Sequence, residues 1–163
     1  MKTPPVSHEG LILRKLRAAL TDMPAVQYAS GMGSANRFPL QGWNLVGQQQ
    51  FQFGDLRIET PTTTIVVEAE SAGGVTNLAK YWPYLEGRPA KRFVLVHLFQ
   101  VWSSNDYVSH LRLWEYLVER MRADLESRMD VRWPDNWEAR LFRYGPQLET
   151  TSEVAAFVRE AAS

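Results

Sequence analysis

The 163-residue chain contains no cysteine. This absence excludes disulfide bonds, thiolate metal sites and cysteine nucleophiles, and it fits a reducing compartment. Long apolar runs are missing too, since the most apolar stretch, 93–102, is interrupted by His97 and Gln100. This stretch is far too short to span a membrane as a helix. The N-terminus, Met1-Lys2-Thr3-Pro4-Pro5, is polar and has no apolar stretch of signal-peptide length. We expect a cytoplasmic protein that does not associate with membranes.

The chain also lacks net charge, because 18 Lys and Arg residues balance 18 Asp and Glu residues. Nucleic-acid-binding proteins usually carry a basic surplus or a basic face, so only a local basic patch would support such a partner here. The three histidines are scattered and lack zinc-site spacing. His97, inside an apolar run, is interpreted as a hydrogen-bonded core histidine. The absence of Gly-x-Ser-x-Gly and Gly-Lys-Ser/Thr motifs argues against a serine hydrolase and a P-loop protein.

What is present is a globular composition, with 45% hydrophobic and 22% charged residues. Hydrophobic periodicity and β-branched runs predict alternating helices and strands. The expected helices lie near 7–20, 75–85 and 106–128, with a last helix from Ser152, and the expected strands at 51–59, 62–70, 92–102 and 137–144. This order predicts one α/β domain over residues 1–163, with 1–6 as a flexible tail. We expect a mixed β-sheet flanked by α-helices on both faces.

Details of three elements can be predicted. Ser7 is expected to cap the first helix, with Leu11, Ile12, Leu16 and Ala19 or Leu20 on its inward face. Strands 51–59 and 62–70 are separated by a short turn and should pair as an antiparallel hairpin. Pro83 should kink the helix at 75–85 or split it into two short pieces.

Two acidic residues stand out on the strand 62–70. Glu68 and Glu70 are two positions apart, so both side chains leave the same face of the strand, and their neighbours are apolar. Burying two carboxylates is costly unless a metal ion or a basic side chain compensates their charge. The candidate basic partners are Arg57, Lys80 and Arg92.

A third acid, Asp55, precedes this strand. If the hairpin closes near 60–63, Asp55 lies across from Glu68 and Glu70, and the three carboxylates can converge. Such oxygen ligands suit Mg²⁺, which can activate a water and stabilise charge on a phosphoryl oxygen. The alternative is a solvated strand end whose acids pair with Arg57 or Lys80.

The segment that contains these acids resembles the motif of a known family. Gly54-Asp55, then Ile65-Val66-Val67-Glu68-Ala69-Glu70, then a helix with Asn77, Lys80 and Tyr81, is similar to the PD-(D/E)XK nuclease superfamily, which has the restriction-endonuclease-like fold. Members share an α-β-β-β-α-β core, with an acid on one strand and acid-x-lysine on the next. The resemblance extends over roughly residues 7–125. It implies metal-dependent hydrolysis of phosphodiester bonds.

The resemblance also implies roles for individual residues. Asp55 and Glu68 would be ligands of Mg²⁺ or Mn²⁺, and Glu9 lies where many members carry an additional acidic ligand. Glu70 stands where the family usually has lysine, and it would ligate a second ion or act as a general base. Lys80, on the following helix, would stabilise charge on the phosphate or orient the attacking water. The catalytic candidates are thus Asp55, Glu68, Glu70 and Lys80.

Two functions remain open at this point. The first is a Mg²⁺-dependent nuclease that acts on DNA, and the apolar surroundings of Glu68 and Glu70 favour it. The second is a catalytically inactive protein of the same fold that binds DNA or a protein partner as a small homodimer. Zero net charge and the missing motif lysine favour the second.

Overall fold

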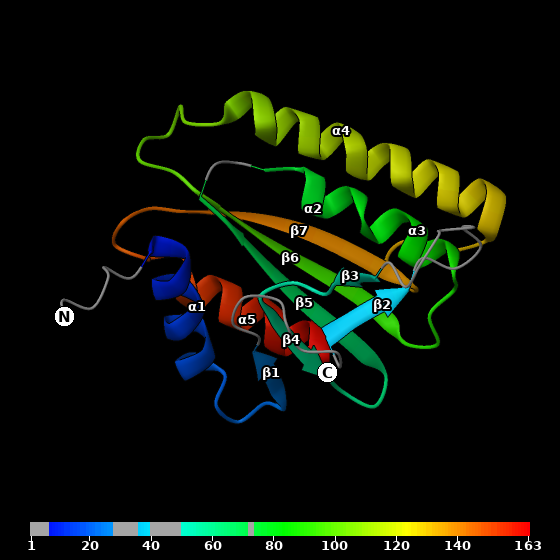
Figure 1. Cartoon of the computed structure of the whole chain (residues 1–163), viewed down its shortest axis with the longest axis horizontal. Helices are drawn as coiled ribbons and strands as arrows, with labels where there is room; N and C mark the ends of the chain where they lie inside the picture. Colours follow the sequence, from blue (N-terminus) through cyan, green and yellow to red (C-terminus); the bar gives the residue numbers. More distant parts are fainter. Residues whose placement is uncertain (1–6, 28–35, 40–49, 72–73) are drawn as a thin grey trace.

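The computed structural model describes residues 7–27, 36–39, 50–71 and 74–163, so the predicted tail 1–6 lies outside the described residues. The main feature is a five-stranded mixed sheet with the strand order β1-β4-β5-β6-β7 (Figure 1). Its strands are β1 (Ala25–Gln27), β4 (Leu56–Glu59), β5 (Thr63–Glu70), β6 (Arg92–Gln100) and β7 (Trp137–Tyr144). A separate antiparallel pair joins β2 (Arg37–Pro39) to β3 (Gln50–Gln52). The predicted α/β class is confirmed.

Strand β4 runs antiparallel to the other four strands of the main sheet. It pairs in this sense with β1 and with β5, whereas β5, β6 and β7 are mutually parallel. The register of β4 and β5 runs from Leu56 opposite Val67 to Glu59 opposite Thr64, which confirms the predicted hairpin.

The strand expected at 51–59 is divided into two, because β3 belongs to the small sheet and β4 begins only at Leu56. Gly54 lies at the division. A Cβ atom there would be 2.4 Å from the carbonyl oxygen of Val67 and 2.6 Å from a methyl carbon of Val66. Only glycine allows the backbone to pass so close to β5.

Helices cover both faces of the main sheet. On one face lie α1 (His8–Ala19) and α5 (Thr151–Ala162); on the other lie α2 (Thr76–Ala79), α3 (Tyr81–Glu86) and α4 (Val108–Asp124), which continues into a π-helical turn, η2 (Leu125–Met129). The side chains of β5 alternate between these layers. Ile65 and Val67 pack with α1 and α5, whereas Val66 packs with α3 and α4. Coverage on both faces explains the nearly continuous apolar sequence of β5 and β6.

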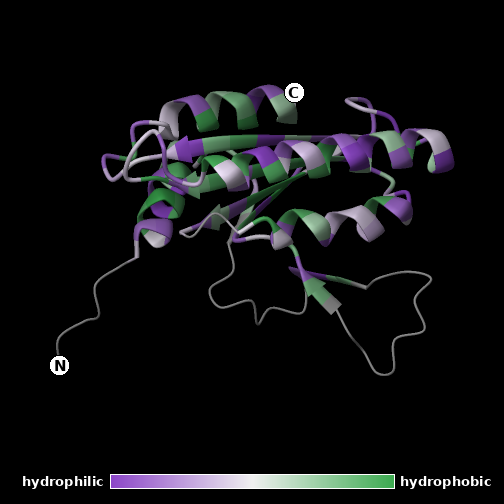
Figure 2. Ribbon diagram, turned by 90° about the horizontal axis from the view of Figure 1, so that it is seen from above, coloured by the Kyte–Doolittle hydropathy of each residue, from purple (hydrophilic) through white to green (hydrophobic). Residues whose placement is uncertain are grey.

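The helices are amphipathic, as expected for layers with one side against a sheet and one side in water. Figure 2 shows them banded in green and purple along their lengths. None of the helices in the described ranges has both the length and the apolar character that crossing a membrane requires.

Some details of the helices differ from the prediction. Ser7 caps α1 as expected, since its hydroxyl accepts a hydrogen bond from the Gly10 N–H at 3.2 Å. The prediction that Leu11 faces inward is wrong: Leu11 is 37% exposed and Leu13 is buried instead. The buried side of α1 is set by its contact with α5, a partner distant in sequence that the local pattern does not reveal.

The helix expected at 75–85 is split, as predicted, but the break falls at Lys80 and not at Pro83. Pro83 is the third residue of α3, where a backbone N–H has no acceptor within the helix, so proline costs little there. The last helix begins at Thr151, and Ser152 therefore lies inside it and is not its cap.

The two leucines of α1 predicted to face inward give a matched test of this packing. Leu16→Ala should lower the free energy of unfolding by about 2–5 kcal/mol, because Leu16 is fully buried and its removal leaves a cavity. Leu11→Ala should change it by only about 0.5 kcal/mol, as is usual for exposed sites. Urea denaturation of the two variants and the wild type measures both values. Equal losses would contradict the orientation of α1.

Candidate functional site

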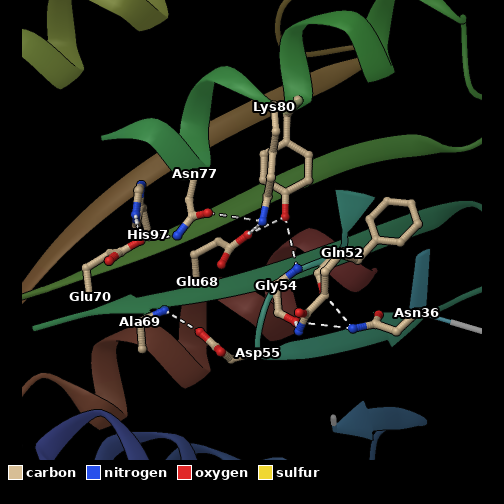
Figure 3. Close-up of polar contacts among 12 residues, drawn as sticks. Asn36, Gln52, Gly54, Asp55, Glu68, Ala69, Glu70, Asn77, Lys80 and His97 are labelled. Atoms are coloured by element: carbon tan, nitrogen blue, oxygen red, sulfur yellow. Dashed lines mark hydrogen bonds and ion pairs between the residues drawn. The ribbon is translucent and has the colours of Figure 1, made fainter. Parts of the chain in front are cut away.

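Glu68 is the most deeply buried acid of the predicted set, with only 4% of its surface exposed. Its Oε1 atom accepts a hydrogen bond of 2.6 Å from the Tyr81 hydroxyl and forms an ion pair with Lys80 Nζ. The Tyr81 hydroxyl in turn accepts a hydrogen bond of 3.0 Å from the Gly54 N–H. Glu68 is therefore held by two neighbouring residues of the α2–α3 segment, and Tyr81 connects it to the turn that carries Asp55. Figure 3 shows the Lys80 side chain reaching toward Glu68.

Lys80 is the basic partner of Glu68. It lies at the junction of α2 and α3, and its side chain is only 11% exposed. The other two basic residues considered from the sequence pair elsewhere. Arg57 lies 3.3 Å from Glu59, and Arg92 lies 2.6 Å from Glu138.

Asp55 lies beside β5, just before β4 begins. Its N–H donates to the Val67 carbonyl at 2.8 Å, and its Oδ2 atom accepts a hydrogen bond of 2.8 Å from the Ala69 N–H. The carboxylate thus meets β5 at the residue between Glu68 and Glu70. Figure 3 shows it on the other side of the strand from these two glutamates, which lie on the side of α2.

Glu70 takes part in a second group of polar contacts. Its Oε1 atom accepts a hydrogen bond from the Asn77 side-chain amide and lies 3.7 Å from His97 Nε2. His97 is fully buried on β6, and its Nδ1 atom accepts a hydrogen bond of 3.1 Å from the Trp114 indole N–H. The prediction of a hydrogen-bonded core histidine is confirmed.

Burial and neighbouring charges shift the pKa values of two of these acids. The positive charge of Lys80 lowers the pKa of both Asp55 and Glu68, but in each case burial has the larger effect. Burial is the main cause that raises the pKa of Asp55, and the negative charges of Glu9 and Glu70 add to it. Burial also raises the pKa of Glu68, against the opposing effect of Lys80. Both pKa values are raised because burial disfavours the charged form of a carboxyl.

The predicted set of four metal ligands, Asp55, Glu68, Glu70 and Glu9, is not assembled in this structure. Within the described ranges, no group of three or more His, Asp or Glu side chains is arranged to hold a metal ion. The Glu70 carboxylate accepts a hydrogen bond from Asn77, and the Asp55 carboxylate lies on the side of β5 opposite the two glutamates. Glu9 is close enough for its charge to affect the pKa of Asp55.

Sequence reasoning did not predict the roles of several polar residues at this site. The sequence predicted no hydrogen bond for Tyr81, Asn77 or Trp114. The available signal was the spacing on the helix: Asn77 and Lys80 are three residues apart and so lie on one side. The contacts of His97 and Trp114 need the parallel pairing of β5 and β6 and the packing of α4, which the sequence pattern leaves open.

Comparisons with protein-family models, with curated proteins and with solved structures found no match to this chain. The function must therefore be inferred from the chemistry of the residues described above.

The raised pKa of Asp55 makes a prediction about stability. A carboxyl whose pKa is higher in the folded state binds more protons there, so its contribution to stability falls as the pH rises above the unfolded value of 3.8 and through the folded pKa. Asp55→Asn keeps an acceptor for the Ala69 N–H but removes the charge. We expect Asp55→Asn to be more stable relative to wild type at pH 7 than at pH 4.

Urea denaturation of both proteins at the two pH values measures this difference. Asp22→Asn is the matched control, because Asp22 is exposed and its pKa is lowered by Arg159. The control should show the opposite trend. A difference between Asp55→Asn and wild type that does not depend on pH would contradict the burial of a charged Asp55.

Proposed function

We propose that this chain is a Mg²⁺-dependent nuclease of the restriction-endonuclease-like fold that hydrolyses phosphodiester bonds of DNA. The contact between Lys80 and Glu68 carries the proposal. The resembled family places its lysine two residues after this acid, and here Glu70 occupies that position. A lysine from the following helix reaches the same acid, so the pairing of acid and lysine is kept although the motif is changed.

The order of the elements supports the same proposal. Apart from β2 and β3, which form the separate small sheet, the chain runs from α1 through β1, β4, β5 and the pair α2 and α3 to β6. This is an α-β-β-β-α-β succession, which the family shares. The acids also have the order of the motif, with Asp55 next to one strand and Glu68 on the strand that follows.

Two of the acids suit a bound Mg²⁺ ion. Mg²⁺ is commonly held in proteins by one or two carboxylates together with waters and substrate phosphate oxygens. Asp55 and Glu68 would be these carboxylates, and Asp55 would have to turn from the Ala69 N–H toward the side of β5 that carries Glu68. Burial raises the pKa of both carboxyls, and a bound cation would favour their charged forms. When bound, the ion supplies Lewis-acid stabilisation of the phosphoryl oxygens and activates a water.

The remaining chemistry falls to residues of the chain itself. The Lys80 ammonium would stabilise negative charge that develops on the phosphate, and in a buried setting such a charge has a large effect. Tyr81 keeps Glu68 in place by donating a hydrogen bond from its hydroxyl to the carboxylate. Burial and the charge of Glu68 raise the pKa of Tyr81 well above its ordinary value, so the hydroxyl remains a donor at neutral pH.

A second function has its own support. Within the described residues there is no three-acid metal group, and Lys80 already neutralises Glu68 in an ion pair. These observations favour a protein of the same fold without catalytic activity, which would bind DNA or a protein partner as a small homodimer.

Calorimetry with Mn²⁺ or Mg²⁺ separates the two functions. If the chain is a nuclease, the wild type binds the ion and cleaves plasmid DNA only in its presence, and Glu68→Gln loses both properties because a carboxylate ligand is gone. Glu59→Gln is the matched control: Glu59 also pairs with a lysine, Lys91, but at the hairpin end of β4. A wild type that binds no metal would leave only the non-catalytic function.

The relocation of the lysine can be tested separately. Lys80→Gln should reduce cleavage by about 10²–10³-fold, the usual effect of losing one group that stabilises transition-state charge. Adding Glu70→Lys restores the motif order, because residue 70 leaves the same face of β5 as Glu68. We expect the double variant to cleave faster than Lys80→Gln alone.

Lys91→Gln serves as the control for this experiment and should cleave like the wild type. Thermal unfolding shows whether each variant is folded. If the folded double variant cleaves no faster than Lys80→Gln, a lysine at position 70 cannot replace Lys80, and the proposed relocation of the motif lysine is wrong.

A further inference from the structure

Glu70 occupies the position of the motif lysine, and the proposed mechanism gives it no task. We propose that Glu70 is a positioning residue that acts through Asn77 to hold the Lys80 ammonium on Glu68, and that His97, on β6, orients Glu70 through the same carboxylate oxygen. The catalytic meaning of this inference rests on the proposed nuclease function, whereas the contacts that support it do not.

The first step is the side chain of Asn77, which lies between Glu70 and Lys80. Its amide nitrogen donates to Glu70 Oε1, and its Oδ1 atom accepts a hydrogen bond of 3.3 Å from Lys80 Nζ (Figure 3). A carboxylate only accepts hydrogen bonds and an ammonium only donates them. The amide therefore has one favourable orientation between them, and the charge of Glu70 determines that its carbonyl oxygen faces Lys80.

The second step concerns which of the two glutamates pairs with Lys80. Glu68 and Glu70 leave the same face of β5, so a single ammonium group nearby could pair with either. Asn77 satisfies Glu70 with a neutral donor and so leaves Lys80 to Glu68. The hydrogen bond from Lys80 to Asn77 then adds a second contact that fixes the ammonium beside Glu68.

The third step is the orientation of His97. The Trp114 indole can only donate, so His97 Nδ1 must be the unprotonated nitrogen and Nε2 must carry the proton. This Nε2–H lies 3.7 Å from Glu70 Oε1 and has no hydrogen-bond partner among the described residues. The N–H edge of the His97 ring, which carries partial positive charge, thus lies near the Glu70 carboxylate. The ring is fully buried and also packs against Phe99.

The short length of α2 makes these contacts necessary. The helix has only four residues, and a helix of this length has little stability of its own. No side chain caps its N-terminus by a hydrogen bond. The hydrogen bond from Asn77 to Glu70 connects this short helix to the end of β5, just before the lysine.

The test uses the small number of lysines, which are Lys2, Lys15, Lys80 and Lys91. In protein labelled with ¹⁵N at the lysine side chains, NMR resolves each ammonium group and measures its proton exchange with water, and Lys80→Gln assigns the signal. The variants are Glu70→Gln and Asn77→Leu. Glu59→Gln is the control, because it removes the carboxylate that pairs with Lys91.

If Glu70 positions Lys80, proton exchange of the Lys80 ammonium should become faster by about tenfold or more in both variants, as expected for the loss of a hydrogen bond to a charged group. Exchange at Lys91 should stay unchanged in them, and Glu59→Gln should affect Lys91 alone. Unchanged exchange at Lys80 would overturn the proposal. Equal acceleration at Lys80 and Lys91 would also overturn it, since that indicates general loosening of the fold.

A second measurement separates positioning from metal binding. Calorimetry should show that Glu70→Gln binds Mn²⁺ as the wild type does, and cleavage kinetics should show a lower kcat with an unchanged KM. Loss of Mn²⁺ binding in Glu70→Gln would make Glu70 a ligand and contradict the positioning role. If the wild type neither binds metal nor cleaves DNA, the nuclease function fails while the exchange measurements still decide whether Glu70 positions Lys80.

Discussion

The ion pair of Glu68 and Lys80 is the constraint on which the candidate site depends. A carboxylate on a central strand between two helical layers cannot be hydrated, so its charge must be matched inside the protein. Lys80 provides the matching charge, and Tyr81 provides a hydrogen bond to the same oxygen. Well-packed apolar side chains in place of a buried ion pair often give an equal or higher free energy of unfolding. The presence of the pair is therefore easier to understand as part of a functional site.

Several features of the backbone serve this pair. Gly54 lets the chain pass close to β5, so that the Tyr81 hydroxyl can accept a hydrogen bond from its N–H and donate to Glu68 at once. The break between α2 and α3 places Lys80 at a helix junction, and not along a continuous helix. The parallel pairing of β5 with β6 sets Glu68 beside His97. Local geometry and long-range pairing therefore converge on the same few side chains.

The sequence predicts the framework well, because hydrophobic patterns repeat with the period of each element. The strand at 137–144, the hairpin of β4 and β5, and the buried β6 all follow from such patterns. Most of the buried face of α1 was predicted, since Ile12, Leu16 and Leu20 are buried. The burial of Leu13 in place of Leu11 depends on α5, and the division at Gly54 depends on how closely the chain approaches β5.

The site was predicted in part. The partnership of Glu68 with Lys80 was one of three ion pairs that the sequence allowed, and only packing of α2 over β5 selects it. The predicted shared site for four acids is not assembled. Strand alternation predicts which face Glu68 and Glu70 leave, but it does not predict how the Asp55 side chain leaves the turn before β4. The contacts of Asn77, His97 and Trp114 join four separate elements, and single-sequence patterns contain no information of that kind.

The polar partners of the Glu68 carboxylate, Lys80 and Tyr81, and the Gly54 N–H that donates to Tyr81 all lie within residues 54–81, although they belong to different elements. Closing such a short loop has a small entropic cost, so the hairpin and the helix pair can meet early in folding. The layer formed by α1 and α5 joins the two ends of the chain and must close a far longer loop. The chemistry of the site is thus encoded locally, whereas the shielding of the sheet from water depends on segments that dock from a distance.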